Sequence, residues 1–201
     1  MTVTAKLLSQ LDRIRDWDGQ PLAPWMRERI EREKARLRLV EEQLSGLRKQ
    51  QNARLKTERT ALMEKIRLLQ QLRGIAVKSS WVFVMELFGW RSFQNRREVA
   101  GALGLTPMPY QSGDSHRDQG ISRAGNGRVR SMAIEIAWSW LRYQPQSQLS
   151  QWYQERFGGT KGRMKRIGIV AMTRRLMVDL WRFLEFGTVP AGASLKASVS
   201  K

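Results

Sequence analysis

The chain has 201 residues, with 36 Lys and Arg, 18 Asp and Glu, one His and no Cys, so its formal net charge is +18. A chain of this length with 41% hydrophobic residues is expected to form one or two folded domains. Because the chain has no cysteine, disulfides, cysteine-ligated zinc and thiol catalysis are excluded. The sequence has no run of 18 apolar residues and no secretory signal, which predicts a cytoplasmic protein without a membrane span. The positive charge favours nucleic acid over a membrane surface as the binding partner.

Residues 1–71 carry a net charge of +6 and are predicted to form a helical arm. Within them, residues 5–16 predict a short amphipathic helix, which the Gly and Pro residues of 18–24 end. From about residue 25 to residue 72 the apolar side chains recur at coiled-coil spacing with one stutter. The predicted seam consists of Ile30, Leu37, Val40, Leu44, Leu47, Gln51, Leu55, Leu62, Ile66 and Leu69. The alternative is one long amphipathic helix packed on its own domain.

Residues 72–189 are predicted to form a compact multi-helix domain, so the fold class is all-α. Two short helices are expected before residue 104, and Asn95 with Glu98 has the spacing of a capping box. The segment Gly74-Ile75-Ala76 is compatible with a helix-hairpin-helix element, in which backbone N–H groups contact phosphates, and equally with a plain packing turn.

Residues 105–124 contain two Pro and two Gly, which predicts a functional loop rather than a helix. Three helices are expected after it, beginning after Gly125-Asn126-Gly127, at about 147–157 and at about 165–186. Residues 190–201 are small and polar and are predicted to be a disordered tail.

The loop holds the candidate reacting groups. Ser112 precedes a glycine, and its hydroxyl could attack a phosphodiester if a base or a metal ion assisted it. A phosphate-binding loop without chemistry is the simpler interpretation of a Ser-Gly pair. Tyr110 is a weaker candidate nucleophile, His116 reads as a solvated bystander, and the two loop acids Asp114 and Asp118 are fewer than a two-metal nuclease site requires.

Several short motifs occur at a characteristic spacing in the second half of the chain. They are Leu72-Arg73-Gly74-Ile75, Glu86-Leu87-Phe88-Gly89-Trp90, Gly104-Leu105-Thr106-Pro107, Tyr110-Gln111-Ser112-Gly113, Gln119-Gly120-Ile121-Ser122-Arg123-Ala124-Gly125-Asn126 and Ile167-Gly168-Ile169-Val170-Ala171. Through them residues 72–196 resemble the C-terminal transposase domain of bacterial insertion-sequence transposases related to Piv-type invertases, described as bridge-RNA-guided serine recombinases. Residues 25–71 resemble the coiled-coil arm that precedes this domain.

The resemblance implies DNA cleavage and rejoining by the serine of the Ser-Gly motif, which is Ser112. It also implies a structured guide RNA, and a dimer or tetramer assembled through the arm. On this basis the expected phosphate and DNA contacts are Arg117, Arg123, Asn126, Arg128, Arg130, Lys161, Arg163, Lys165 and Arg166. The expected location is the bacterial cytoplasm, at the nucleoid.

Family members carry, before the arm, an RNase-H-like domain with a four-acid metal site, and no such segment occurs in this sequence. We therefore expect no metal or other cofactor on this chain, with Mg²⁺ belonging to the acid domain, and we expect strand transfer to require that domain in trans. The alternatives are a non-catalytic DNA-binding remnant and an assembly module whose function lies in the arm.

Overall fold

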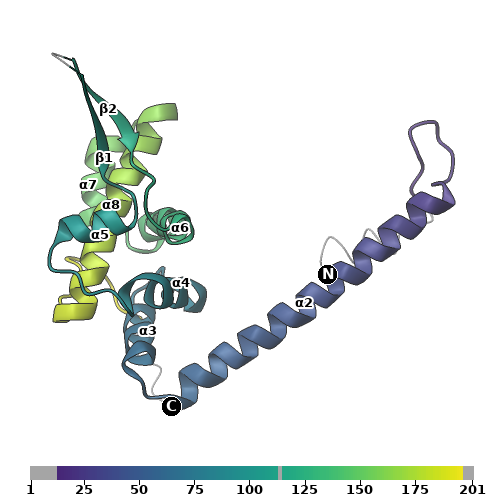
Figure 1. Cartoon of the computed structure of the whole chain (residues 1–201), viewed down its shortest axis with the longest axis horizontal. Coiled ribbons are helices and arrows are strands. Elements are labelled where there is room, and N and C mark those ends of the chain that lie inside the picture. The colour runs from purple at the N-terminus through teal and green to yellow at the C-terminus, as the bar shows by residue number, and fades with distance from the viewer. Residues whose placement is uncertain (1–12, 113–114, 197–201) are drawn as a thin grey trace. The chain divides into compact units, whose positions relative to one another are not determined.

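The computed structural model describes residues 13–112 and 115–196, and for residues 108–119 it describes the backbone without the side chains. It contains two compact units, Met1–Glu58 and Arg59–Lys201, which are drawn in Figure 1 and considered separately here. The described residues form seven α-helices, one π-helical turn and a single two-stranded sheet. The all-α prediction is therefore confirmed, with one β-hairpin as its exception.

The first unit consists of a turn followed by the long helix α2 (Pro24–Thr57). Pro24 suits the first helical position because its fixed φ matches the helix and its missing N–H would have no partner there. No residue of α2 is buried within its unit, and Leu37, Val40, Leu44 and Leu47 are exposed. The predicted coiled-coil partner of this stripe stays a prediction. Of the expected short helix 5–16, residues 5–12 lie outside the described part, and Arg15 pairs with Pro21 in an isolated bridge.

The helix that was expected to continue to residue 72 ends at Thr57, so the single seam predicted from Ile30 to Leu69 is wrong. Thr60 starts a new helix, α3 (Ala61–Gln71), by accepting a hydrogen bond from the Met63 N–H. Ile66 and Leu69 are fully buried in the second unit because α3 packs against its helices. The structure thus divides the chain after Glu58, earlier than the predicted boundary after residue 71.

The second unit is built around the long helix α8 (Gly162–Phe186). Four helices contact it, namely α3, α5 (Arg96–Ala102), α6 (Gly127–Tyr143) and α7 (Gln148–Phe157). Next to α3 lie α4 (Val77–Phe83) and the π-helical turn η2 (Val84–Phe88). Trp140, Phe83 and Phe88 are among the largest fully buried side chains, so the core lies where α4, η2, α6 and α8 meet. Figure 1 shows this cluster of helices.

Helix ends in the second unit follow the sequence signals closely. Asn95 caps α5 by accepting hydrogen bonds from the Arg97 and Glu98 N–H groups. Glu98 accepts from the Gln94 N–H and from the Asn95 side-chain amide, whereas a capping box would use the Asn95 backbone N–H. The Asn95 cap is therefore confirmed with a changed partner for Glu98. Gly187 ends α8 in the left-handed conformation at φ 67°.

The turn between α3 and α4 contains Gly74 at φ 88°, and side chains donate hydrogen bonds to the carbonyl groups of this turn. The Ser139 hydroxyl donates to the Gly74 carbonyl, and the Gln144 amide donates to the carbonyls of Arg73 and Ser194. The turn itself is a packed junction between two helices. The helix-hairpin-helix interpretation of this turn stays a prediction.

The end of the chain is ordered up to residue 196, so the disordered tail predicted from residue 190 is wrong for 190–196, and 197–201 lie outside the described residues. Leu195 pairs with Leu72 in a β-bridge. The Lys196 ammonium donates to the carbonyls of Gln70 (2.6 Å) and Ile75 (2.7 Å), and burial lowers its pKa. Small polar residues lie here because the segment runs over the surface, with its backbone bonded to the domain.

The loop predicted at 105–124 contains an antiparallel hairpin of β1 (Pro107–Ser112) and β2 (Ser115–Ile121). In Figure 1 the hairpin extends away from the helices of its unit. Its base is tied down where residues 102–106 cross residues 122–126, through bonds from Ser122 N–H to the Thr106 carbonyl and from Arg123 N–H to the Gly104 carbonyl. The prolines do not prevent pairing, because two strands leave edge positions at which no N–H is needed.

Candidate nucleic-acid interface

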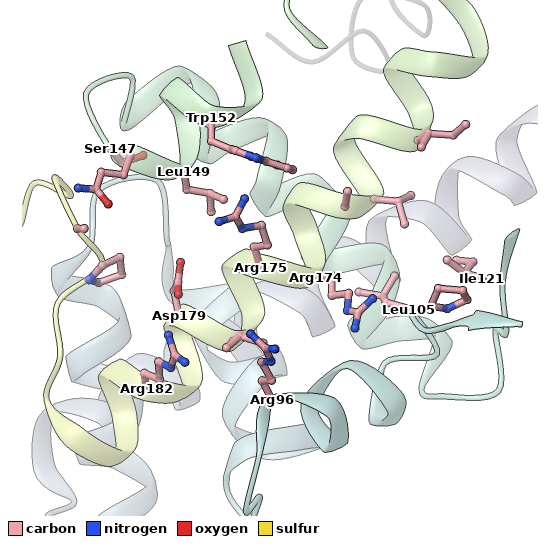
Figure 2. Close-up of a pocket in the computed structure, with 18 of the residues that line it drawn as sticks. Arg96, Leu105, Ile121, Ser147, Leu149, Trp152, Arg174, Arg175, Asp179 and Arg182 are labelled. Carbon is pink, nitrogen blue, oxygen red and sulfur yellow. The ribbon is translucent and has the colours of Figure 1, made fainter. Parts of the chain in front are cut away.

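A groove with a volume of about 1320 Å³ runs along α8 in the second unit. Its other walls are the base of the hairpin, the start of α5, the start of α7 and the segment 188–191 (Figure 2). Within this groove Ile167 is exposed and Val170 is partly exposed, although both are apolar. The helix therefore has two apolar faces, one in the core and one forming the groove.

Among the described side chains, seven arginines and a single acid line the groove. The arginines are Arg96, Arg123, Arg163, Arg166, Arg174, Arg175 and Arg182. Five of them come from α8, where steps of three, seven and eight residues keep side chains on one broad face. Figure 2 shows Arg174, Arg175 and Arg182 projecting from α8, with Arg96 approaching from α5. A cationic groove of this kind concentrates field lines and attracts phosphates, for which the guanidinium fork is well suited.

Asp179 is the acid in this groove. Its carboxylate lies near Arg175 and Arg182 in Figure 2. Burial raises the pKa of Asp179, and the charges of Arg182 and Arg175 act in the opposite direction. The groove thus holds one partly desolvated negative charge among its cations.

The change Asp179→Asn tests the part that this charge plays. A unit charge at roughly 7 Å in water contributes about 0.6 kcal/mol, so we expect affinity for DNA to rise about threefold. Because the folded-state pKa is raised, ionisation of Asp179 opposes folding as pH rises through that pKa, and the variant should be at least as stable at pH 7. Fluorescence anisotropy and thermal unfolding measure the two effects. Glu155→Gln, on the exposed part of α7 outside the groove, is the control, and equal changes in both variants would contradict this role.

One aromatic side chain lines the groove together with the arginines. Trp152 of α7 is half-buried, and the guanidinium carbon of Arg175 lies 4.3 Å from its ring centroid. The Trp152 ring also makes an edge contact with Phe157 at 5.9 Å between centroids. Trp152 thus connects Phe157 on one side to the groove wall on the other.

The predicted basic run at the start of α8 divides between two surfaces. Lys161, Arg163, Lys165 and Arg166 are all exposed, but only Arg163 and Arg166 line the groove. Lys165 lies over the Trp138 ring of α6, with its ammonium 5.3 Å from the centroid. Residues two apart on a helix point to nearly opposite sides, so Lys165 faces away from the surface that holds Arg163.

The predicted contacts at the start of α6 are engaged in internal bonds. Asn126 accepts hydrogen bonds from the N–H groups of Arg128 and Val129 and donates to Glu86. Arg128 forms an ion pair with the same Glu86, at 2.9 Å. Glu86 lies in the π-helical turn η2, and nothing in the sequence indicated that it would face residue 128. Both Asn126 and Arg128 remain exposed.

Arg130 also serves the crossing beneath the hairpin. Its guanidinium donates hydrogen bonds to the carbonyls of Leu103 (3.1 Å) and Arg123 (3.2 Å), which lie on the two segments that cross beneath the hairpin. Arg123 is the one predicted contact of the loop that lines the groove, and it adopts a positive φ of 56°. Sequence reasoning missed Arg96, Arg174, Arg175 and Arg182, although the acid-free basic stretch around Arg174 and Arg175 was a usable signal.

Ser112 is the last residue of β1, where its backbone pairs with that of Ser115, and Arg117 pairs with Tyr110. The side chains of Ser112 and Arg117 lie outside the described part of the chain. At about 3.3 Å per strand residue, some 16 Å of extended backbone separates Ser112 from Pro107 at the hairpin base. The structure therefore does not place the Ser112 backbone beside Arg123, Asn126, Arg128 and Arg130.

Metal-binding side chains do not gather in the described residues, where no three His, Cys, Asp or Glu side chains lie together in a way that could hold an ion. Within the same residues, no helix is both long and apolar enough to cross a bilayer.

An arginine-lined groove on an all-α domain is the kind of surface that proteins use to hold nucleic-acid backbones. Among known families, the model described as "Transposase IS116/IS110/IS902 family" matches residues 66–153 of this chain. Two curated proteins of Sinorhizobium fredii are similar. "Putative transposase y4rJ" is 36% identical over 196 residues, covering 94% of this chain and 49% of the relative. "Putative transposase y4qE" is 36% identical over 77 residues, covering 38% of this chain and 20% of the relative.

The match overlaps the part of the chain that carries the motifs quoted above, and the similarity to y4rJ extends over nearly the whole chain. The chain spans about half the length of y4rJ.

Proposed function

We propose that this chain is the DNA-binding and strand-transfer part of a DNA transposase, working with a further acidic domain. The observation that carries the proposal is the arginine groove on a domain that matches the IS116/IS110/IS902 family. In this proposal the groove holds nucleic-acid backbone, and Ser112 at the far end of β1 supplies the nucleophile. Mg²⁺, if the reaction uses it, is held by the acidic domain.

The chemical step transfers a phosphoryl group to Ser112. Its hydroxyl oxygen attacks the phosphorus, and the bond from phosphorus to one deoxyribose oxygen breaks. The serine proton passes to solvent or a base, and the departing oxygen takes up a proton to leave as a hydroxyl. The energy of the DNA linkage is kept in the phosphoserine bond, so attack by another DNA hydroxyl reverses the step and rejoins strands.

The Ser112→Ala variant tests this assignment. The chain is mixed with an acid domain from a family transposase, with Mg²⁺, a guide RNA and labelled element DNA, and covalent protein–DNA adducts are counted on denaturing gels. We expect an adduct with the unchanged chain and none with Ser112→Ala, because no other group replaces the lost oxygen. Ser115→Ala, whose backbone pairs with Ser112, is the matched control and should keep the adduct. An adduct that survives Ser112→Ala would overturn the assignment.

Assembly through α2 is the second part of the proposal. Leu37, Val40, Leu44 and Leu47 form an exposed apolar stripe at spacings of three and four residues on a helix with no buried residue. A second copy of this helix would cover the stripe and form a dimer or tetramer. Sedimentation equilibrium measures the oligomeric mass directly. We also propose a structured guide RNA as partner and the bacterial nucleoid as the location.

A further inference from the structure

Six apolar side chains line the arginine groove and form its floor, namely Leu105, Leu149, Ile167, Val170, Val178 and Val189. Ile167 and Val189 are exposed and Val170 is partly exposed, whereas Leu105, Leu149 and Val178 are almost fully buried. Ile167 is 45% exposed, whereas other residues of the same turn of α8 are buried in the core. A nucleic-acid duplex presents phosphates, sugars and base edges, and keeps the faces of its bases stacked inside. Under a duplex this floor would find no apolar partner, whereas the base faces of an unpaired strand supply one.

The stack of Arg175 on Trp152 strengthens this distinction. With 4.3 Å between the guanidinium carbon and the ring centroid, the two planes form one side of the groove, and Arg175 is exposed to it. Unpaired bases stack on aromatic rings and on arginine planes, at about 1–3 kcal/mol for each base. Both members of the pair lie in the groove lining in Figure 2.

The dimensions indicate a polymer. About 1320 Å³ exceeds the ~300–1,000 Å³ typical of small-molecule sites. From Arg163 to Arg182 the groove follows α8 for roughly 28 Å at 1.5 Å per residue. A strand of several nucleotides can lie along such a length, with phosphates reaching arginines at both ends.

We propose that the groove binds an unpaired strand of nucleic acid. Its phosphates contact the arginines of the walls, and its bases contact the apolar floor and the Arg175–Trp152 stack. The proposal rests on the proposed function in taking this groove as the nucleic-acid surface, and it adds that the groove favours a single strand over a duplex.

Fluorescence anisotropy on the full chain tests the proposal. The probes are a single-stranded DNA of about 12 nucleotides, the RNA of the same sequence and the matching DNA duplex, all at one salt concentration. Ile167→Ser should weaken binding of the single strands at least about threefold, through lost apolar contact, and leave duplex binding unchanged. Met164→Ser, at an equally exposed apolar residue of α8 outside the groove, is the matched control and should change neither.

Arg175→Lys keeps the charge and removes the planar group. We expect single-strand affinity to fall at least about fivefold, with Arg156→Lys unchanged, because Arg156 lies 5.9 Å from the same ring but outside the groove. The DNA and RNA arms then tell which strand is bound. Duplex affinity equal to or above single-strand affinity would overturn this proposal and leave the nucleic-acid role in place. Binding of polyglutamate with no binding of any nucleic acid would overturn both.

Discussion

Replacing Arg166 and Arg174 together with glutamine is expected to lower affinity for DNA about a hundredfold. Both side chains line the groove, and Arg174 lies beside Leu105 and Ile121 in Figure 2. A hydrogen bond to a charged group contributes ~1.5–3 kcal/mol, so two lost phosphate contacts cost about 3 kcal/mol or more. Glutamine keeps the stem and some hydrogen bonding, which limits damage to the fold.

The salt dependence distinguishes this loss from an indirect one. Each phosphate contact contributes about 0.9 to the slope of log affinity against log salt on duplex DNA, and about 0.7 on single strands, so the double variant should show a slope flatter by about 1.4 to 1.8. Arg142 and Arg156 changed to glutamine form the matched control, since both are exposed in the same unit outside the groove. If the control pair lost as much affinity and slope as the groove pair, binding would follow net charge and the groove would have no special role.

Gly125→Ala is expected to destabilise the second unit by about 3 kcal/mol or more. A methyl group there would collide with the Ala102 carbonyl oxygen and lie 2.5 Å from the Gly104 nitrogen. Those atoms belong to the backbone of the crossing that anchors the hairpin, where Asn126 N–H donates to the Ala102 carbonyl at 3.2 Å. Overpacking against backbone, which cannot rotate away, lies at the severe end of such substitutions.

Urea unfolding followed by tryptophan fluorescence measures this effect, since six of the eight Trp lie in the second unit. Gly101→Ala is the control, because nothing lies within 4 Å of its added methyl group and it sits in helix α5. There alanine should stabilise by up to about 1 kcal/mol through helix propensity. A Gly125→Ala variant as stable as Gly101→Ala would show that the crossing can open without cost.

Local signals gave most of the helical elements correctly. The caps at Asn95 and Gly187 and the apolar stripe of α6 were read from sequence, since each depends on residues within one or two turns. The break at residues 58–60 was missed, because a coiled-coil spacing continues through it and a single Thr cap after two charged residues is a weak signal. The hairpin was read as a loop, because its pairing is non-local and its strands carry Pro and Gly.

The candidate site shows the same division between local and distant information. The excess of cations and the sequence motifs indicated a nucleic-acid function, and of the expected DNA contacts Arg123, Arg163 and Arg166 line one groove. Lys165, expected as a DNA contact with them, lies over Trp138 outside the groove. Arg128 was assigned to a phosphate and is paired with Glu86, which is 42 positions away in the sequence.

The sequence by itself determined the charge, the family motifs and the helices, because composition, spacing and capping are properties of neighbouring residues. The tertiary structure decided which of the many cations share a surface. That depends on the rotation of α8 against α6 and α7, on the crossing under the hairpin and on the final segment at 188–196, whose backbone bonds fix it against the domain. A net charge of +18 predicts a polyanionic partner. The packing of α8 decides which of the cations gather as an arginine groove with an apolar floor.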